Sequence, residues 1–461
     1  MAPVTAELVA VAGALAVIVV GATLIPGVAR VLLIAQASYW AMSYLARPVV
    51  LLWCRPRPQY GDSIADPRLA DLGYPFAISQ VLPPVVFGLW VYAGLVVGYA
   101  LWRRGRPEPP YAKPDPRLLP TLGISYGLGM LARAGSYLSG SIGGAGDVAS
   151  SHPFIDFLTM LGAIGALGMI IFVRLPRPGA TAAVLAILVV GELGWSALVE
   201  SKTPIMGAAL GIAVRFAVTG WTRAKVAGML GIALAAIGGF GRLQSFKESP
   251  SARASGALLN AGYPGPVQPF LSALRRFDLL EAATDSYFYR SSQHWMSGGE
   301  FFGHAVRSLV PTQLLGGEKY HAGTAWAEQV RGASVDMSRI QVSLAEGNIN
   351  EGWLFGGHAG VVLCVAFTFA LLLCSTWALR GRYILALICL GLALVELPVL
   401  FERGILGSFE VLGKVLQVSV LVWLVYLSVG EYQRVRAERT VSVRACLRTR
   451  VAGLQTLQND P

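Results

Sequence analysis

The chain has 461 residues, of which 54% are hydrophobic and 14% charged, and its formal net charge is +11. Soluble domains carry about 25% charged residues, so this composition excludes an ordinary soluble protein. The apolar runs are continuous and close to the roughly 20 residues that a membrane helix needs, whereas barrel strands alternate. Much of the positive charge lies in short loops and in the C-terminal part, so it does not indicate a nucleic-acid partner.

The apolar runs predict an all-α polytopic membrane protein with about eleven transmembrane helices. The first run lacks a basic segment before it, so we expect a retained span and not a signal peptide. The predicted spans are residues 6–25, 30–53, 77–102, 118–138, 154–173, 181–199, 205–221, 226–240, 353–379, 383–401 and 408–430.

Basic residues in the short connections set the predicted orientation. The connection 103–117 and the segment after Glu431 are rich in arginine, which favours the cytoplasm for both. With eleven spans, the N-terminus and the longest connection then lie outside. The predicted parts are a bundle of about eight helices at 1–240, an extracytoplasmic loop domain at 241–352, about three helices at 353–430 and a basic cytoplasmic tail at 431–461.

The long connection is the most informative part of the chain, because long loops carry function on a rigid scaffold. Between Arg242 and Glu351 it holds eight arginines, two lysines, ten acidic residues and three of the five histidines. A guanidinium group binds phosphate oxygens through two parallel hydrogen bonds and keeps its charge, so this loop suits a diphosphate at the membrane surface. The alternative for any single arginine is an ion pair with one of the acids.

Basic residues outside the loop add to these candidates. Lys202 lies in the short outer turn between two spans, Arg403 lies between the last two spans, and Arg133 lies near the outer end of a span. Each could instead extend to the interface or pair inside the bundle. The candidate diphosphate ligands are Lys202, Arg133, Arg242, Arg275, Arg276, Arg290, Arg307 and Arg403.

A glycine-rich segment at the re-entry into the membrane supplies candidate bases. Residues 344–360 contain Glu346, Glu351 and His358, and the glycines permit close approach of the backbone to a ligand. Together with His294 they are the predicted catalytic residues, because a carboxylate or imidazole can take a proton from a sugar hydroxyl. The alternative is a helix N-terminus whose acids are favoured by the helix dipole. Because the sequence has no metal-ligand spacing, we expect neither a metal nor a cofactor.

Four segments carry a resemblance to a known family. They are Glu200-Ser-Lys-Thr-Pro204, Leu274-Arg-Arg-Phe-Asp-Leu-Leu280, Val310-Pro-Thr-Gln-Leu-Leu-Gly-Gly-Glu-Lys319, and Ala345-Glu-Gly-Asn-Ile-Asn-Glu-Gly352 with Gly357-His-Ala-Gly360. They resemble the Ser-Arg turn, the Arg-Phe loop helix, the Ile-Pro…Lys-Pro stretch and the Ala-Glu…Asn-Phe-Gly…Gly re-entry of bacterial oligosaccharide repeat-unit polymerases of the Wzy type. The chain departs from that pattern at Lys202, which replaces an arginine, and after Val310-Pro, where an arginine is missing.

The resemblance implies an inverting, metal-independent glycosyltransferase of GT-C-like architecture in the bacterial inner membrane, with its active site facing outward. It would move a growing glycan from undecaprenyl diphosphate to a hydroxyl of another lipid-linked repeat unit. Its other partners would be membrane lipid and the flippase and chain-length regulator of the same pathway.

Three alternatives remain open. An O-antigen ligase would use the same donor and transfer the glycan to lipid A core. A transporter or flippase of lipid-linked oligosaccharides would need polar groups along a path, such as Glu192, Glu396 and Lys414. The third is a membrane scaffold of a polysaccharide assembly complex.

Overall fold

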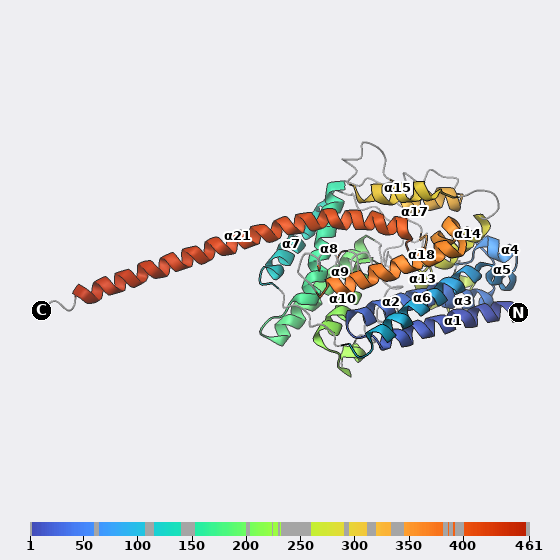
Figure 1. Ribbon diagram of the computed structural model, residues 1–461, viewed down its shortest axis with the longest axis horizontal. Helices are drawn as coiled ribbons and strands as arrows, with labels where there is room; N and C mark the ends of the chain where they lie inside the picture. Colours follow the sequence, from blue (N-terminus) through green and yellow to red (C-terminus); the bar gives the residue numbers. More distant parts are fainter. Residues whose placement is uncertain are drawn as a thin grey trace.

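Every regular element that the structure describes is a helix, as the sequence predicts. The structure is a computed structural model of the chain (Figure 1). The described residues are 2–59, 64–106, 115–139, 153–199, 203–223, 225–228, 231, 260–289, 295–310, 320–332, 345–380, 386, 391 and 401–457.

Five of the described helices are long and apolar enough to cross a membrane, and these support a multi-pass membrane protein. They are α1 (Ala2–Thr23), α6 (Pro83–Arg103), α9 (Pro178–Leu198), α18 (Asn348–Ala378) and α21 (Ile405–Leu457). Two shorter apolar helices accompany them, the Phe157–Phe172 part of α8 (Pro153–Phe172) and α10 (Thr203–Thr219). The predicted spans 226–240 and 383–401 lie almost wholly outside the described residues.

Two predicted spans are built from more than one helix. The region 30–53 consists of α2 (Val28–Ala41), a π-helical turn η1 (Met42–Ala46) and α3 (Arg47–Cys54), which follow one another without a break. The region 77–102 begins in α5 (Tyr74–Val81), and α6 starts anew at Pro83. Proline is favoured in the first turn of a helix, where its missing N–H costs nothing. The short α4 (Pro67–Asp71) precedes α5.

Close glycine contacts join α7 (Leu118–Leu138) to α8. A Cβ atom on Gly162 would lie 2.9 Å from the Cα atom of Gly129, and one on Gly165 would lie 2.5 Å from the backbone nitrogen of Tyr126. Small residues allow membrane helices to approach this closely, so the backbones themselves form the interface. In a second group, α1, α2, α6 and α18 pack together (Figure 1).

The described part of the long connection is helical and lies on the bundle. It contains α13 (Gln268–Leu274), α14 (Leu279–Phe288), α15 (Gly298–Leu309), α17 (Ala322–Ala325) and the π-helical turn η3 (Trp326–Val330). A reciprocal cap between Ser297 and Glu300 starts α15, which packs along the beginning of α21 (Figure 1). Helix α14 packs against α18 and α5.

Helix α18 is broken at Gly356 and Gly357, and Gly357 has a φ of 56° that favours glycine. The break brings Gly352 against Gly360, because a Cβ atom on Gly352 would lie 2.6 Å from the carbonyl oxygen of Gly360. In a straight helix their Cα atoms would be about 12 Å apart. The first turns of α18 therefore fold back on the rest and bring Glu351 to the start of α21.

We predict that Gly129→Ala destabilises the protein by about 1–3 kcal/mol, because the added methyl group overlaps the backbone of Gly162. Gly127→Ala on the same helix is the control, because no atom lies within 4 Å of the position that its added methyl group would take. The control should be neutral or stabilising by about 0.5–1 kcal/mol, since alanine favours helix. Thermal unfolding of both variants in one detergent tests this, and equal midpoints would contradict the close contact.

Candidate functional site

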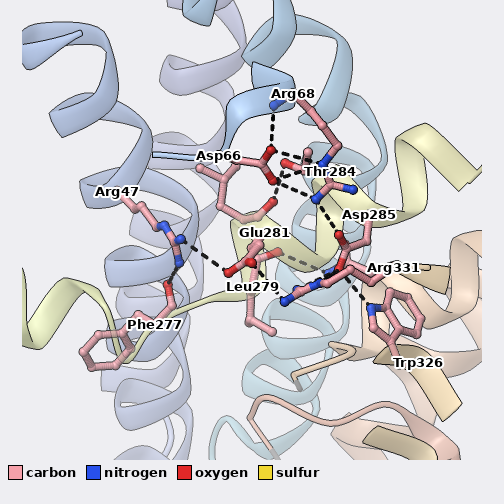
Figure 2. Close-up of polar contacts among 12 residues, drawn as sticks. Arg47, Asp66, Arg68, Phe277, Leu279, Glu281, Thr284, Asp285, Trp326 and Arg331 are labelled. Atoms are coloured by element: carbon pink, nitrogen blue, oxygen red, sulfur yellow. Dashed lines mark hydrogen bonds and ion pairs between the residues drawn. The ribbon is translucent and has the colours of Figure 1, made fainter. Parts of the chain in front are cut away.

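Asp285 on α14 is fully buried and holds the outer segment to the bundle (Figure 2). Its carboxylate accepts hydrogen bonds from Arg68 Nη2 at 2.6 Å, Arg331 Nη2 at 2.8 Å and the indole Nε1 of Trp326 at 3.2 Å. Arg68 also pairs with Asp66 at 2.7 Å. A buried carboxylate is stable only when such partners compensate its lost hydration.

Glu281 lies one helical turn before Asp285 and extends the same network. Arg331 Nη1 lies 2.9 Å from its Oε1 atom, and Arg47 Nη2 lies 3.6 Å from its Oε2 atom. Burial raises the pKa of Glu281, while Arg331 and Arg47 lower it. We call Arg47, Arg68, Glu281, Asp285 and Arg331 the arginine clamp. Its guanidinium groups are engaged by carboxylates, which favours a structural role over phosphate binding.

A second cluster lies where α21 begins. The Glu351 carboxylate accepts the backbone N–H of Ile405 and, at 3.2 Å, that of Leu406. These N–H groups have no partner within the helix, and the positive end of the helix dipole favours the negative carboxylate. A Cβ atom on Gly404 would collide with this carboxylate, so a glycine is required there. The alternative interpretation of the re-entry acids as partners of a helix N-terminus therefore applies to Glu351.

Glu346 lies beside Glu351 but is bound less completely. Its side chain is 1% exposed, and Oε2 accepts the backbone N–H of Gly404 at 3.4 Å. Its Oε1 atom is buried without a hydrogen-bond partner among the residues that the structure describes. Burial raises the pKa of Glu346 to about 7, against the lowering effect of Arg403. The carboxylate can therefore take up a proton near neutral pH.

Three basic side chains surround Glu410 on α21 and form a rim next to these acids. Arg403 Nη1 lies 3.5 Å, His321 Nδ1 3.2 Å and Lys414 Nζ 2.9 Å from a Glu410 carboxylate oxygen. His321 is 58% and Lys414 51% exposed, so solvent reaches them. Glu410 therefore has more than one basic partner. We call Glu346, Glu351, Arg403, Glu410, His321 and Lys414 the α21 site.

Among the other predicted residues, Arg133, Arg275 and His358 have partners that do not belong to this site. Arg133 forms a buried ion pair with Glu192 at 2.6 Å, and Arg275 donates to Asn260 Oδ1 at 2.9 Å. His358 follows the break in α18 and packs edge-on against Phe87. Arg276 is half-buried next to Arg275, and Arg307 is exposed on α15. Lys202, Arg242, Arg290 and His294 lie outside the described residues.

Sequence reasoning did not assign His321 or Glu410 to a site, and it considered Lys414 only for a transport path. The spacing of four residues between Glu410 and Lys414 is a recognisable helical ion-pair signal, but nothing local indicates the approach of His321. No sequence pattern indicated the arginine clamp either, although Glu281 and Asp285 share one helix face.

Among the described residues, no group of three or more histidine, cysteine, aspartate or glutamate side chains is placed to bind a metal ion. Comparison of the chain with models of known protein families, with curated proteins and with solved structures found no match in any of the three. The resemblance to repeat-unit polymerases therefore rests on its four segments, one of which, the re-entry, forms part of the α21 site.

We predict that Asp285→Asn lowers the free energy of unfolding by about 1.5–3 kcal/mol, because the neutral amide loses the charged hydrogen bonds to Arg68 and Arg331, which keep Asp66 and Glu281 as partners. Arg434→Gln is the control, since it breaks an exposed ion pair with Glu438 and should cost at most about 1 kcal/mol. Thermal unfolding in detergent compares them, and similar midpoints would show that the clamp does not hold the fold.

Proposed function

We propose that the protein is a glycosyltransferase that polymerises undecaprenyl-diphosphate-linked repeat units at the outer face of the bacterial cytoplasmic membrane. The main support is a single juxtaposition: the buried carboxylate of Glu346, with one oxygen unbonded among the described residues, lies beside the cationic rim at the start of α21. A base and a set of cations are what transfer from a diphosphate to a hydroxyl requires.

The proposed reaction inverts the anomeric carbon in one step. The acceptor hydroxyl oxygen forms a bond to the anomeric carbon of the donor glycan, and the bond from that carbon to the diphosphate oxygen breaks. The hydroxyl proton passes to Glu346, and the bonding electrons leave with the lipid diphosphate. Arg403, Lys414 and the ring N–H of His321 would stabilise the charge that develops on the leaving group.

Glu346 is a better candidate base than the other predicted catalytic residues that the structure describes. Both oxygens of Glu351 accept backbone N–H groups, so this residue serves the helix end. His358 packs against Phe87 and Trp353 on the other side of the break. Glu346 is buried near Tyr320, and α15 packs along the start of α21 (Figure 1). Substrate entry would therefore require α15 and the segment at Tyr320 to move. Their return would exclude water from the closed site.

We also propose that the protein has about eleven spans in a GT-C-like arrangement. The long connection would lie outside and the C-terminus inside. An O-antigen ligase remains the nearest alternative, because it needs the same leaving-group chemistry. The transport path considered from Glu192 has less support, because that carboxylate is paired with Arg133.

The function can be tested by deleting the gene and examining lipid-linked glycans. A polymerase deletion should abolish the glycan ladder and retain single repeat units on the lipid carrier. A ligase deletion would instead leave polymer on the carrier without attachment to lipid A core. An unchanged ladder would refute both transferases.

We predict that Glu346→Gln reduces polymer formation about 10²–10⁴-fold at normal expression, because the amide cannot accept the proton. The base acts in its ionised form, so the wild-type rate should rise as pH increases through about 7. The rate of the variant should not show this rise. Glu328→Gln, an exposed glutamate of the same outer segment, is the control and should behave as wild type. A normal rate for Glu346→Gln would move the base elsewhere.

We predict that Arg403→Ala lowers the rate about 10²–10³-fold, the usual cost of losing one preorganised donor. Arg403→Lys should recover little of it, since an ammonium group lacks the planar fork. Arg434→Ala, at an exposed position of α21, should retain full activity. Assays with purified lipid-linked substrate would measure the three rates, and normal-length polymer from Arg403→Ala would remove this residue from the leaving-group site.

A further inference from the structure

An apolar groove lies between α2 and α10, and its lining contains none of the residues of the α21 site. It has a volume of about 480 Å³, within the range of about 300–1,000 Å³ that small-molecule sites occupy. Val31 and Ile34 of α2 form one wall, and Leu210 and Ala213 of α10 form the other. Ala209 lines it and is exposed, so the groove opens on the outside of the described helices.

The length of the groove matches one leaflet of a bilayer. Its lining on α2 extends from Arg30 to Met42, which is about 18 Å along a helix. The hydrocarbon core is about 30 Å thick, so the groove spans about half of it. Tyr39, Phe277 and Phe401 line the part farther from Arg30. An acyl chain that entered at Arg30 would therefore run along α2 towards Tyr39, Phe277 and Phe401.

The end of the groove at Arg30 carries groups that suit an anionic lipid head. Arg30 donates its Nε hydrogen to the carbonyl oxygen of Ile25 at 2.9 Å, and a guanidinium has five N–H donors in all. Trp221 lines the same groove and contacts Phe216, over which the Lys225 ammonium lies 5.2 Å from the ring centroid. Tryptophan with nearby basic side chains is typical of the membrane–water interface.

We infer that this groove binds one anionic phospholipid, with the phosphate at Arg30 and one acyl chain along α2. Charge complementarity supports the head-group position, and the one-leaflet length supports a single chain. This site does not depend on the proposed transferase activity. It does touch the α21 region, because Tyr39 donates its hydroxyl hydrogen to Glu402, whose carbonyl accepts the N–H of Gly347 at 2.6 Å.

Native mass spectrometry of the purified full-length protein tests this inference. Phosphatidylglycerol and phosphatidylcholine with identical acyl chains would be the probes, and undecaprenyl phosphate would be the competitor. Wild type should retain phosphatidylglycerol preferentially. Arg30→Gln should reduce that binding about fivefold, whereas Arg30→Lys should largely keep it. Ala209→Trp, which fills the groove, should reduce binding of both phospholipids.

Arg104→Gln is the matched control, because it removes one exposed basic charge away from the groove. Equal phosphatidylglycerol binding by Arg30→Gln and Arg104→Gln would overturn the head-group assignment. Unchanged phospholipid binding by Ala209→Trp would overturn the groove itself. If Ala209→Trp loses only undecaprenyl phosphate, the occupant is the polyprenyl carrier and the phospholipid proposal fails. Thermal midpoints of all four variants would verify that they are folded.

Discussion

The burial of Asp285 constrains the position of the outer segment. A carboxylate in the interior needs charged and polar partners, and here they come from α4, from η3 and from the residue just after η3. Through Glu281 the same network reaches Arg47 on α3, which also donates to the carbonyl of Phe277 at 3.1 Å. Phe277 in turn packs edge-on against Tyr39, the partner of Glu402. One buried charge thus orders a path of contacts that ends beside the α21 site.

Two neighbouring glutamates in the re-entry segment acquire different chemistry from their surroundings. Glu351 accepts the open N–H groups of a helix end, and these hydrogen bonds fix the orientation of its carboxylate. Glu346 loses its hydration, and among the described residues it receives one long hydrogen bond, from Gly404. A buried carboxylate with an unbonded oxygen is a candidate for proton exchange at an active site.

The helical class and several helix bounds follow from the sequence, but the sites do not. The expected span 118–138 coincides with α7, because a proline-rich connection and an apolar run define its start. The break between α5 and α6 at Pro83 and the break in α18 at Gly356 were missed, since hydropathy ignores backbone geometry. Contacts such as Arg68 with Asp285 join residues far apart in the chain, and only tertiary packing brings them together.

Helix α21 is one unbroken element of 53 residues (Figure 1). At the usual rise it is about 80 Å long, roughly twice the 40–45 Å of a bilayer with its head groups. Its first turn is tied to Glu351, while its last turns project well beyond the bundle (Figure 1). A stiff rod of this kind moves as a lever. A small tilt of α21 at the Glu351 end would displace its C-terminal end by a larger distance. A structural change at Glu351 could therefore alter what the C-terminal end contacts.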